Sequence, residues 1–158
     1  MKVLSTSAQR VQEALDAAGV TTRIVEYEVP ARTSAEAAAV LGCTVGQIAK
    51  SLVFKSASGA SILVIASGAH RVDEAKVAVL AGESIGKADP SFVRATTGYA
   101  IGGIPPLAHA TRSRTFIDRN LLGYDTVYAA GGTPHAMFPI TPEELVRVAG
   151  GTVADTAP

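Results

Sequence analysis

A short turn between two apolar runs restricts the fold more than any other feature of the sequence. Residues 51–56 and 61–67 are rich in apolar side chains, and the turn between them lies at residues 55–59 (Lys-Ser-Ala-Ser-Gly). A connection this short joins antiparallel strands, because a parallel pair needs a crossover of about a dozen residues or more. The sequence therefore predicts an antiparallel or mixed sheet and disfavours a doubly wound parallel fold.

Other segments rich in β-branched and aromatic residues predict the remaining strands. They cover residues 23–29, 99–102, 115–118, 126–130, 137–140 and 152–155. Helix starts are marked by capping residues, such as Thr33 with Glu36 three positions later, and several helix ends are marked by glycine. About six helices are expected, from Ser7 to Ala18, Thr33 to Gly42, Thr44 to Lys50, Asp73 to Leu80, Asp89 to Gly98 and Thr141 to Gly150.

Length and composition fit one domain over residues 1–158. A chain of 158 residues with 47% hydrophobic residues can bury a single core. Fourteen Lys and Arg balance fourteen Asp and Glu, which argues against a protein that coats nucleic acid nonspecifically, although a local RNA contact remains open. We expect no DNA partner.

The sequence also suggests a compartment. The single cysteine, Cys43, excludes an internal disulfide framework and a cysteine-rich zinc site. Neither a signal-peptide core nor an apolar run of membrane-spanning length is found. We therefore expect a cytoplasmic protein without a membrane partner.

Common catalytic signatures are missing. The sequence has no glycine-rich phosphate loop, no dinucleotide fingerprint and no G-x-S-x-G elbow, and His70, His109 and His135 are too scattered to predict a metal site. We expect chemistry that requires neither a metal nor a cofactor, and in which no protein nucleophile is needed.

Two places could still carry chemistry. Lys50 is expected where a capped helix meets an apolar strand, so it either complements the helix dipole or grips a phosphate or polarises a carbonyl. Residues 102–106 (Gly-Gly-Ile-Pro-Pro) form either an ordinary tight turn or a stiff loop whose backbone N–H groups approach a ligand. His135, in a second turn-rich loop, is either an exposed loop residue or a site residue.

Several separate segments together resemble the YbaK and prolyl-tRNA synthetase associated family. They are Ile48–Phe54, Gly102–Pro106, Phe116–Asp118 with Leu121-Leu122, Val127–Gly132 and the closing Thr141–Leu145. The resemblance extends over almost the whole chain. It implies a mixed α/β fold with a largely antiparallel, curved, barrel-like sheet and flanking helices.

The family resemblance also implies an activity and a set of site residues. The activity is hydrolysis of the ester of misacylated tRNA in trans, on tRNA for proline charged with a small amino acid such as Ala or Cys. The partners would be the aminoacyl-tRNA 3′ end and prolyl-tRNA synthetase. The implied catalytic residues are Lys50, Gly102 and Gly103, and the implied substrate-binding residues are Ser51, Ile104, Pro105, Pro106 and His135.

Ile104 departs from relatives that act on cysteinyl substrates, which commonly carry a polar residue there. The apolar side chain suits a small apolar amino acid better and leaves the specificity open. Two other classes of function are also open. One is a noncatalytic module of the same fold that binds tRNA or a synthetase, and the other is a domain that binds a small regulatory molecule.

Overall fold

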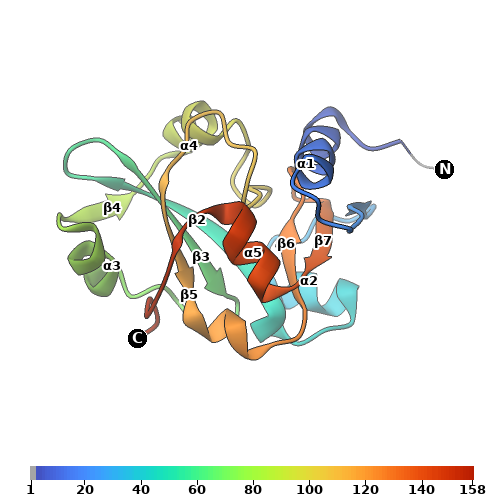
Figure 1. Cartoon of the computed structure of the whole chain (residues 1–158). Helices are drawn as coiled ribbons and strands as arrows, with labels where there is room; N and C mark the ends of the chain where they lie inside the picture. Colours follow the sequence, from blue (N-terminus) through green and yellow to red (C-terminus); the bar gives the residue numbers. More distant parts are fainter. Residues whose placement is uncertain (1–2) are drawn as a thin grey trace.

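The computed structural model describes residues 3–158 and shows one mixed sheet with helices packed around it (Figure 1). The five α-helices of this part of the chain are α1 (Thr6–Ala17), α2 (Ser34–Leu41), α3 (Glu74–Ala81), α4 (Pro90–Thr97) and α5 (Pro142–Ala149). This part of the chain also contains two 3-10 helices, η1 (Val45–Gln47) and η2 (Arg119–Gly123).

Eight strands form the sheet: β1 (Val25–Glu26), β2 (Ile48–Ser56), β3 (Ser61–Ser67), β4 (Ile85–Lys87), β5 (Arg114–Asp118), β6 (Val127–Ala130), β7 (Ala136–Ile140) and β8 (Thr152–Ala154). Their order is β1-β7-β6-β2-β3-β5-β8, with β4 on the side of β2 that also carries β6. The pairs β1–β7, β6–β7, β2–β3 and β2–β4 are antiparallel, and β2–β6, β3–β5 and β5–β8 are parallel. The mixed α/β prediction is confirmed, and the curved sheet stays open because β1 and β8 end it.

The helices begin and end where their capping residues predict. Thr33 Oγ1 accepts a hydrogen bond of 3.1 Å from the Glu36 N–H, and Asp89 Oδ1 accepts one of 2.9 Å from the Phe92 N–H. Gly42 ends α2 in the left-handed conformation, with φ of 71°, which a residue without Cβ adopts at little cost. Local capping chemistry therefore sets the bounds of α2 and α4.

The prediction of a helix from Thr44 to Lys50 is wrong beyond its first turn. The capping box of Thr44 and Gln47 is present, but it supports only η1. From Ile48 onward the chain is strand, because Ala49 pairs with Ser67 of β3 and with Ala129 of β6. Lys50 therefore lies within β2 and not in the last turn of a helix.

Two further segments differ from the sequence prediction. Residues 99–102 are a turn and not a strand, since the Gly103 N–H donates to the Ala100 carbonyl at 3.0 Å and closes the chain on itself. The short strand β4 was not expected, and it forms because Ile85–Lys87 add to the far end of β2.

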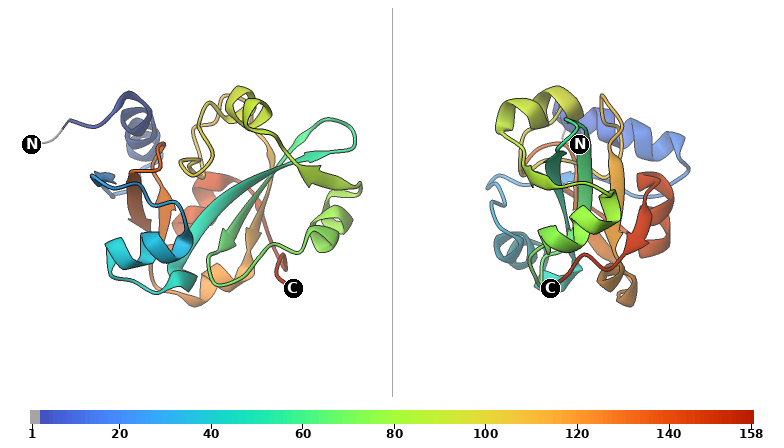
Figure 2. Two further views of the ribbon diagram at one scale, coloured as in Figure 1. Left: turned by 180° about the vertical axis from the view of Figure 1, so that it is seen from behind. Right: turned by 90° about the vertical axis from the view of Figure 1, so that its left-hand side faces the viewer.

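The sheet has apolar side chains packed on both faces. On one face, Val53 and Ile117 pack with side chains of α1, α4 and α5, whereas on the other Phe54 packs with Val77 of α3. Figure 2 shows β2 as a long strand that runs from the region of α2 to that of β4. Because side chains alternate along a strand, Lys50 shares the face of Phe54, and Ser51 shares the face of Val53.

Candidate functional site

The candidate site lies at a gap along one edge of β2, a stretch that no neighbouring strand of the described residues covers. On this edge β6 pairs only with Ile48 and Ala49, and β4 pairs only with residues 54–56. Within residues 3–158, no strand pairs with residues 50–53 on that side. A cavity of about 370 Å³ opens here, lined by residues 31–34, Ala37, residues 48–52, Ile101, Gly102, Ile104, Ala130 and Met137.

Ser51 brings unpaired polar groups to this gap. The Ile48 carbonyl and the Ser56 N–H form their hydrogen bonds on the side of β2 that faces β3. Backbone groups of successive residues in a strand point to alternate edges, so even-numbered residues of β2 bond towards β3. The N–H and carbonyl of Ser51 therefore point to the open edge. The Ser51 hydroxyl is buried and has no hydrogen-bond partner in the described part of the chain. A buried polar atom left unpaired typically costs about 1–3 kcal/mol, so its retention in a cavity wall suggests a ligand contact.

Lys50 places a cation at the same gap. Its side chain is half-buried, and it forms no ion pair within the described residues. Burial lowers the pKa of Lys50 from its usual range, and the nearby charge of Arg71 lowers it further. A partly desolvated cation of this kind attracts an anionic or strongly polarised oxygen.

The start of α2 forms a wall that the sequence analysis did not assign to the site. Arg32, Thr33 and Ser34 line the cavity at the helix N-terminus, where the helix dipole is positive. The capping box of Thr33 and Glu36 predicted the helix start, but only the folded sheet brings it beside Lys50. Local sequence signals did not reveal this proximity.

The Gly-Gly-Ile-Pro-Pro loop meets the cavity through only part of its length. Gly102, with φ of 93°, and the buried Ile104 line the cavity together with Lys50 and Ser51. The structure therefore brings four of the predicted residues together. The positive φ explains a glycine at position 102, because side chains are strained in that conformation.

Gly103 has a different reason to be a glycine from the one expected. Its N–H donates to the Ala100 carbonyl, and a Cβ at this position would lie 2.6 Å from the Thr133 Cα. The missing side chain thus allows close packing of two loops. Gly103 lies outside the residues that line the cavity.

Three further predicted residues also lie outside it. Pro105 is buried and accepts a hydrogen bond from His109 Nε2 at 2.6 Å, and Pro106 lines a different cavity beside His109. His135 bonds to Tyr27 in both directions, since its Nδ1 contacts the Tyr27 carbonyl at 3.0 Å and its own carbonyl accepts from the Tyr27 N–H. These residues support the loops around the cavity and do not form its wall.

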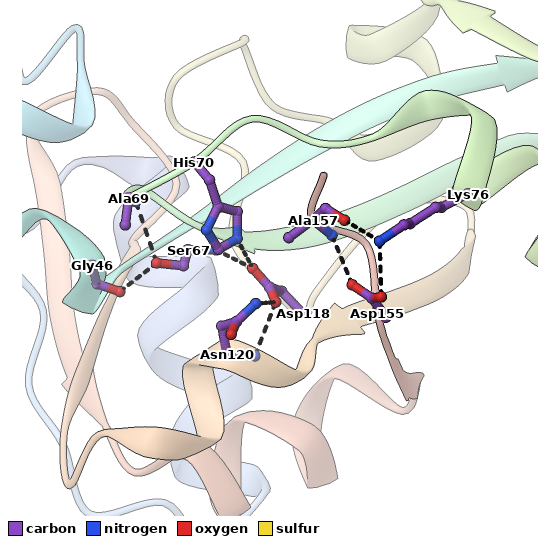
Figure 3. Close-up of polar contacts among 9 residues, drawn as sticks. All are labelled: Gly46, Ser67, Ala69, His70, Lys76, Asp118, Asn120, Asp155 and Ala157. Atoms are coloured by element: carbon purple, nitrogen blue, oxygen red, sulfur yellow. Dashed lines mark hydrogen bonds and ion pairs between the residues drawn. The ribbon is translucent and has the colours of Figure 1, made fainter.

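A second polar cluster surrounds Asp118 at the end of β5 (Figure 3). The fully buried carboxylate accepts hydrogen bonds from the Ser67 N–H, from His70 Nε2 and from both the backbone and side-chain N–H groups of Asn120. His70 lies at 2.6 Å, and its side chain is 25% exposed. In the sequence Asp118 stands out only as part of the Phe116–Asp118 segment, whereas in the structure each of its carboxylate oxygens accepts two hydrogen bonds.

The described residues contain no group of three His, Cys, Asp or Glu side chains placed to hold a metal ion. In the same part of the chain, no helix has the length and apolar character that a membrane crossing requires.

Comparisons with known proteins agree with this architecture. Residues 28–148 match the family described as aminoacyl-tRNA editing domain. A solved structure of a candidate trans-editing enzyme for prolyl tRNA synthetase superposes with a TM-score of 0.93, at 46% identity and over 99% of each chain. The structure of the hypothetical protein APE2540 gives a TM-score of 0.87 at 36% identity, over 94% of this chain and 99% of that one.

A curated relative gives the same picture. The uncharacterized protein YwhH of Bacillus subtilis (strain 168) is 31% identical over 122 residues, which are 77% of this chain and 78% of the relative. Together, the fold and these matches define a mixed α/β editing domain. The chain belongs to the aminoacyl-tRNA editing domain family, which is the YbaK family.

Proposed function

We propose that this protein hydrolyses the ester bond of misacylated tRNA in trans, with tRNA for proline charged with Ala or Cys as the substrate. One observation carries the proposal. Lys50 and Ser51 of β2, whose side chains point to opposite faces of the strand, both line a largely apolar cavity of about 370 Å³ in a member of an editing family, and among the described residues neither the ammonium nor the hydroxyl has a partner. The apolar part suits a small side chain, and the polar part suits the ester.

The proposed chemistry needs only water and electrostatic stabilisation. Water adds to the ester carbonyl carbon and loses a proton, and negative charge develops on the carbonyl oxygen. The Lys50 ammonium and the backbone N–H groups of Gly102 and Ser51 lie at the cavity and can stabilise this charge. Collapse then breaks the bond to the ribose oxygen, which takes up a proton, and the amino acid leaves with a new carboxylate.

Selection would depend on the size of the cavity. Ile104 is 3% exposed and Met137 is 8% exposed, so packed apolar side chains limit the space beside Lys50 and Ser51. A rigid wall rejects a larger amino acid by steric clash more effectively than an apolar pocket rewards one additional methylene. The cavity therefore suits a small substrate side chain. Prolyl-tRNA synthetase would supply the misacylated tRNA, and the activity would take place in the cytoplasm.

A deacylation panel tests the proposal. Purified protein is incubated with tRNA for proline carrying alanine, cysteine or proline, and loss of the labelled amino acid is followed over time. We expect rapid loss of alanine or cysteine and retention of proline. Binding of the charged tRNA without loss of any amino acid would instead support a noncatalytic binding module.

A matched pair of lysines controls for indirect effects. Lys50→Gln removes the cation at the cavity, whereas Lys55→Gln removes an exposed cation on the same strand that lies over the Phe92 ring at 5.0 Å from its centroid. Only Lys50→Gln should abolish turnover. Equal losses in both variants would contradict the proposed role of the cavity.

A further inference from the structure

A second cavity adjoins the candidate site and shares part of its wall. It has a volume of about 510 Å³ and is bordered by Lys50 and Leu52, which also line the first cavity. Beyond these two residues it is bordered by Arg71 from the segment before α3 and by Lys87 from β4. The two hollows therefore share Lys50 and Leu52 as a common border, and the second lies towards α3 and β4.

The charges of this second hollow are unbalanced. Lys50, Arg71 and Lys87 border it, and Glu74 is the one acidic residue among its lining residues. None of the three cations forms an ion pair or a side-chain hydrogen bond in the part of the chain that the structure describes. By contrast, Lys76 nearby on α3 is held by Asp155 at 2.9 Å.

Neither Lys50 nor Arg71 forms an ion pair in the described part of the chain. Burial first, and then the nearby charge of Arg71, lower the pKa of Lys50, and both side chains border the same hollow, so the two cations repel each other in the folded protein. Repulsion of this kind costs stability unless an anionic group lies between or beside them. A phosphate satisfies this arrangement well, because guanidinium and ammonium groups both form charge-assisted hydrogen bonds with it.

The lining also indicates which part of a nucleic acid fits. Among the described residues that line the groove, Phe54 is the only aromatic one, and it is 7% exposed, so it offers no free face for base stacking. The charged side chains on the groove are three cations and one carboxylate, that of Glu74. Such a surface contacts the phosphodiester backbone and does not read bases.

We propose that the cationic groove formed by Lys50, Arg71 and Lys87 binds the phosphodiester backbone of the acceptor 3′ strand of tRNA. Lys50 lies between the ester and the first phosphate, Arg71 holds that phosphate, and Lys87 holds a phosphate further along the strand. The inference rests on the proposed function, because it starts with the ester in the first cavity. From that cavity the polynucleotide would run past Arg71 towards Lys87.

Two substrates separate groove contacts from contacts at the ester. One is the misacylated tRNA, and the other is the same amino acid esterified to adenosine, which has no phosphate. Arg71→Gln and Lys87→Gln should each lower kcat/KM on the tRNA by about tenfold, mainly through KM, and leave hydrolysis of the aminoacyl adenosine unchanged. Arg71→Lys should restore part of the loss, and Lys55→Gln should change neither reaction.

A binding measurement tests the groove without catalysis. The affinity for an uncharged acceptor-stem hairpin ending in CCA is followed by fluorescence anisotropy as the salt concentration is varied. Loss of one phosphate contact on a single strand should reduce the slope of log K against log salt by about 0.7. We expect this reduction in Arg71→Gln and in Lys87→Gln but not in Lys55→Gln.

The results distinguish failure of the groove from failure of the proposed function. If the wild-type protein hydrolyses neither substrate, the proposed function is wrong, and the salt slope alone decides whether the groove binds the hairpin. If hydrolysis proceeds but the two groove variants keep wild-type KM and slope, the groove proposal is overturned. Equal losses on tRNA and on aminoacyl adenosine would also overturn it, because they would assign the residues to the ester site or to the fold.

Discussion

The open edge of β2 and the cluster around Asp118 are both polar regions on strands that pair with β3, yet they are organised in opposite ways. At the open edge, the Ser51 hydroxyl and the Lys50 ammonium have no protein partner among the described residues. Around Asp118, both carboxylate oxygens accept hydrogen bonds from several donors. One region keeps polar groups free, and the other pairs them fully.

This difference separates a candidate for binding from a candidate for stability. A buried polar group with partners contributes to the folded state, whereas one without partners weakens it by about 1–3 kcal/mol. The Asp118 cluster joins the end of β3 to the end of β5 and to the start of η2. We therefore expect substitutions there to affect unfolding, and substitutions at the open edge to affect turnover.

Asp118→Ala should have the largest effect. Removal of the carboxylate leaves the buried Ser67 N–H without its acceptor and also removes the bonds from Asn120 and His70, so the free energy of unfolding should fall by about 3–5 kcal/mol. Urea unfolding measures this loss. Turnover per folded molecule should stay close to wild type, and a variant of normal stability would show that the cluster is not structural.

Lys50→Gln should affect the reaction and not the fold. Loss of the cation that faces the developing oxyanion should lower the deacylation rate by about a hundredfold or more, while the urea midpoint stays near that of wild type. Single-turnover deacylation gives the rate. A large loss of stability with an unchanged rate would reverse the proposed assignment of the two regions.

Gly103→Ala should lower stability to an intermediate extent. The new Cβ would meet the Thr133 backbone at 2.6–2.8 Å, so the two loops must move apart, at a cost of about 1–3 kcal/mol. Gly123→Ala is a suitable control, because a Cβ there meets nothing within 4 Å. If thermal melting gave the same midpoint for both variants, the close packing of these loops would not matter.

Ile104→Ala should change selectivity more than rate. The smaller side chain widens the cavity, so discrimination against larger amino acids should weaken by about 1–3 kcal/mol, or roughly tenfold to a hundredfold. The ratio of kcat/KM for alanyl- and prolyl-tRNA measures this change. An unchanged ratio would exclude Ile104 as a wall that selects by size.

The smallest effect is the pH dependence of the Asp118 cluster. Burial acts to raise the pKa of Asp118, but hydrogen bonds from Asn120, Ser67 and His70 outweigh it and hold the pKa below its usual range. As pH falls through about 4, the Asp118 carboxylate is protonated in the unfolded chain before it is protonated in the folded protein. The stability that Asp118 contributes is therefore present above that pH and is lost as pH falls further. The difference in unfolding free energy between wild type and Asp118→Asn should shrink as pH falls from 6 towards the acid range. A constant difference would contradict the lowered pKa.

Local features of the fold were predictable because they depend on neighbouring residues. Thr33, Asp73, Asp89 and Thr141 cap the helices that they were predicted to cap, and β3 spans the predicted residues. The capping box at Thr44 was also read correctly, but the pairing of Ile48 and Ala49 with β6 ended the helix after one turn. Long-range pairing thus overrode a local signal at the position that matters most for Lys50.

The open edge itself was not predictable from the sequence. It arises because β6 and β4 pair with different parts of β2, and β4 contains a glycine and only three residues, which give a weak strand signal. Whether the Ser51 hydroxyl has a partner depends on the same strand pairing. Likewise, the reason for Gly103 became visible only when Thr133 was found against it.

A structure with a nonhydrolysable substrate tests the central claim most directly. In 3′-alanylamino-3′-deoxyadenosine an amide replaces the ester, so the alanyl group and the terminal nucleoside stay joined while bound. We predict that the alanyl carbonyl lies at the open edge of β2 between Lys50, Ser51 and Gly102, with the methyl group towards Ile104. Binding of the compound beside His109 and Arg147, or against His70, with the open edge unoccupied, would contradict the account.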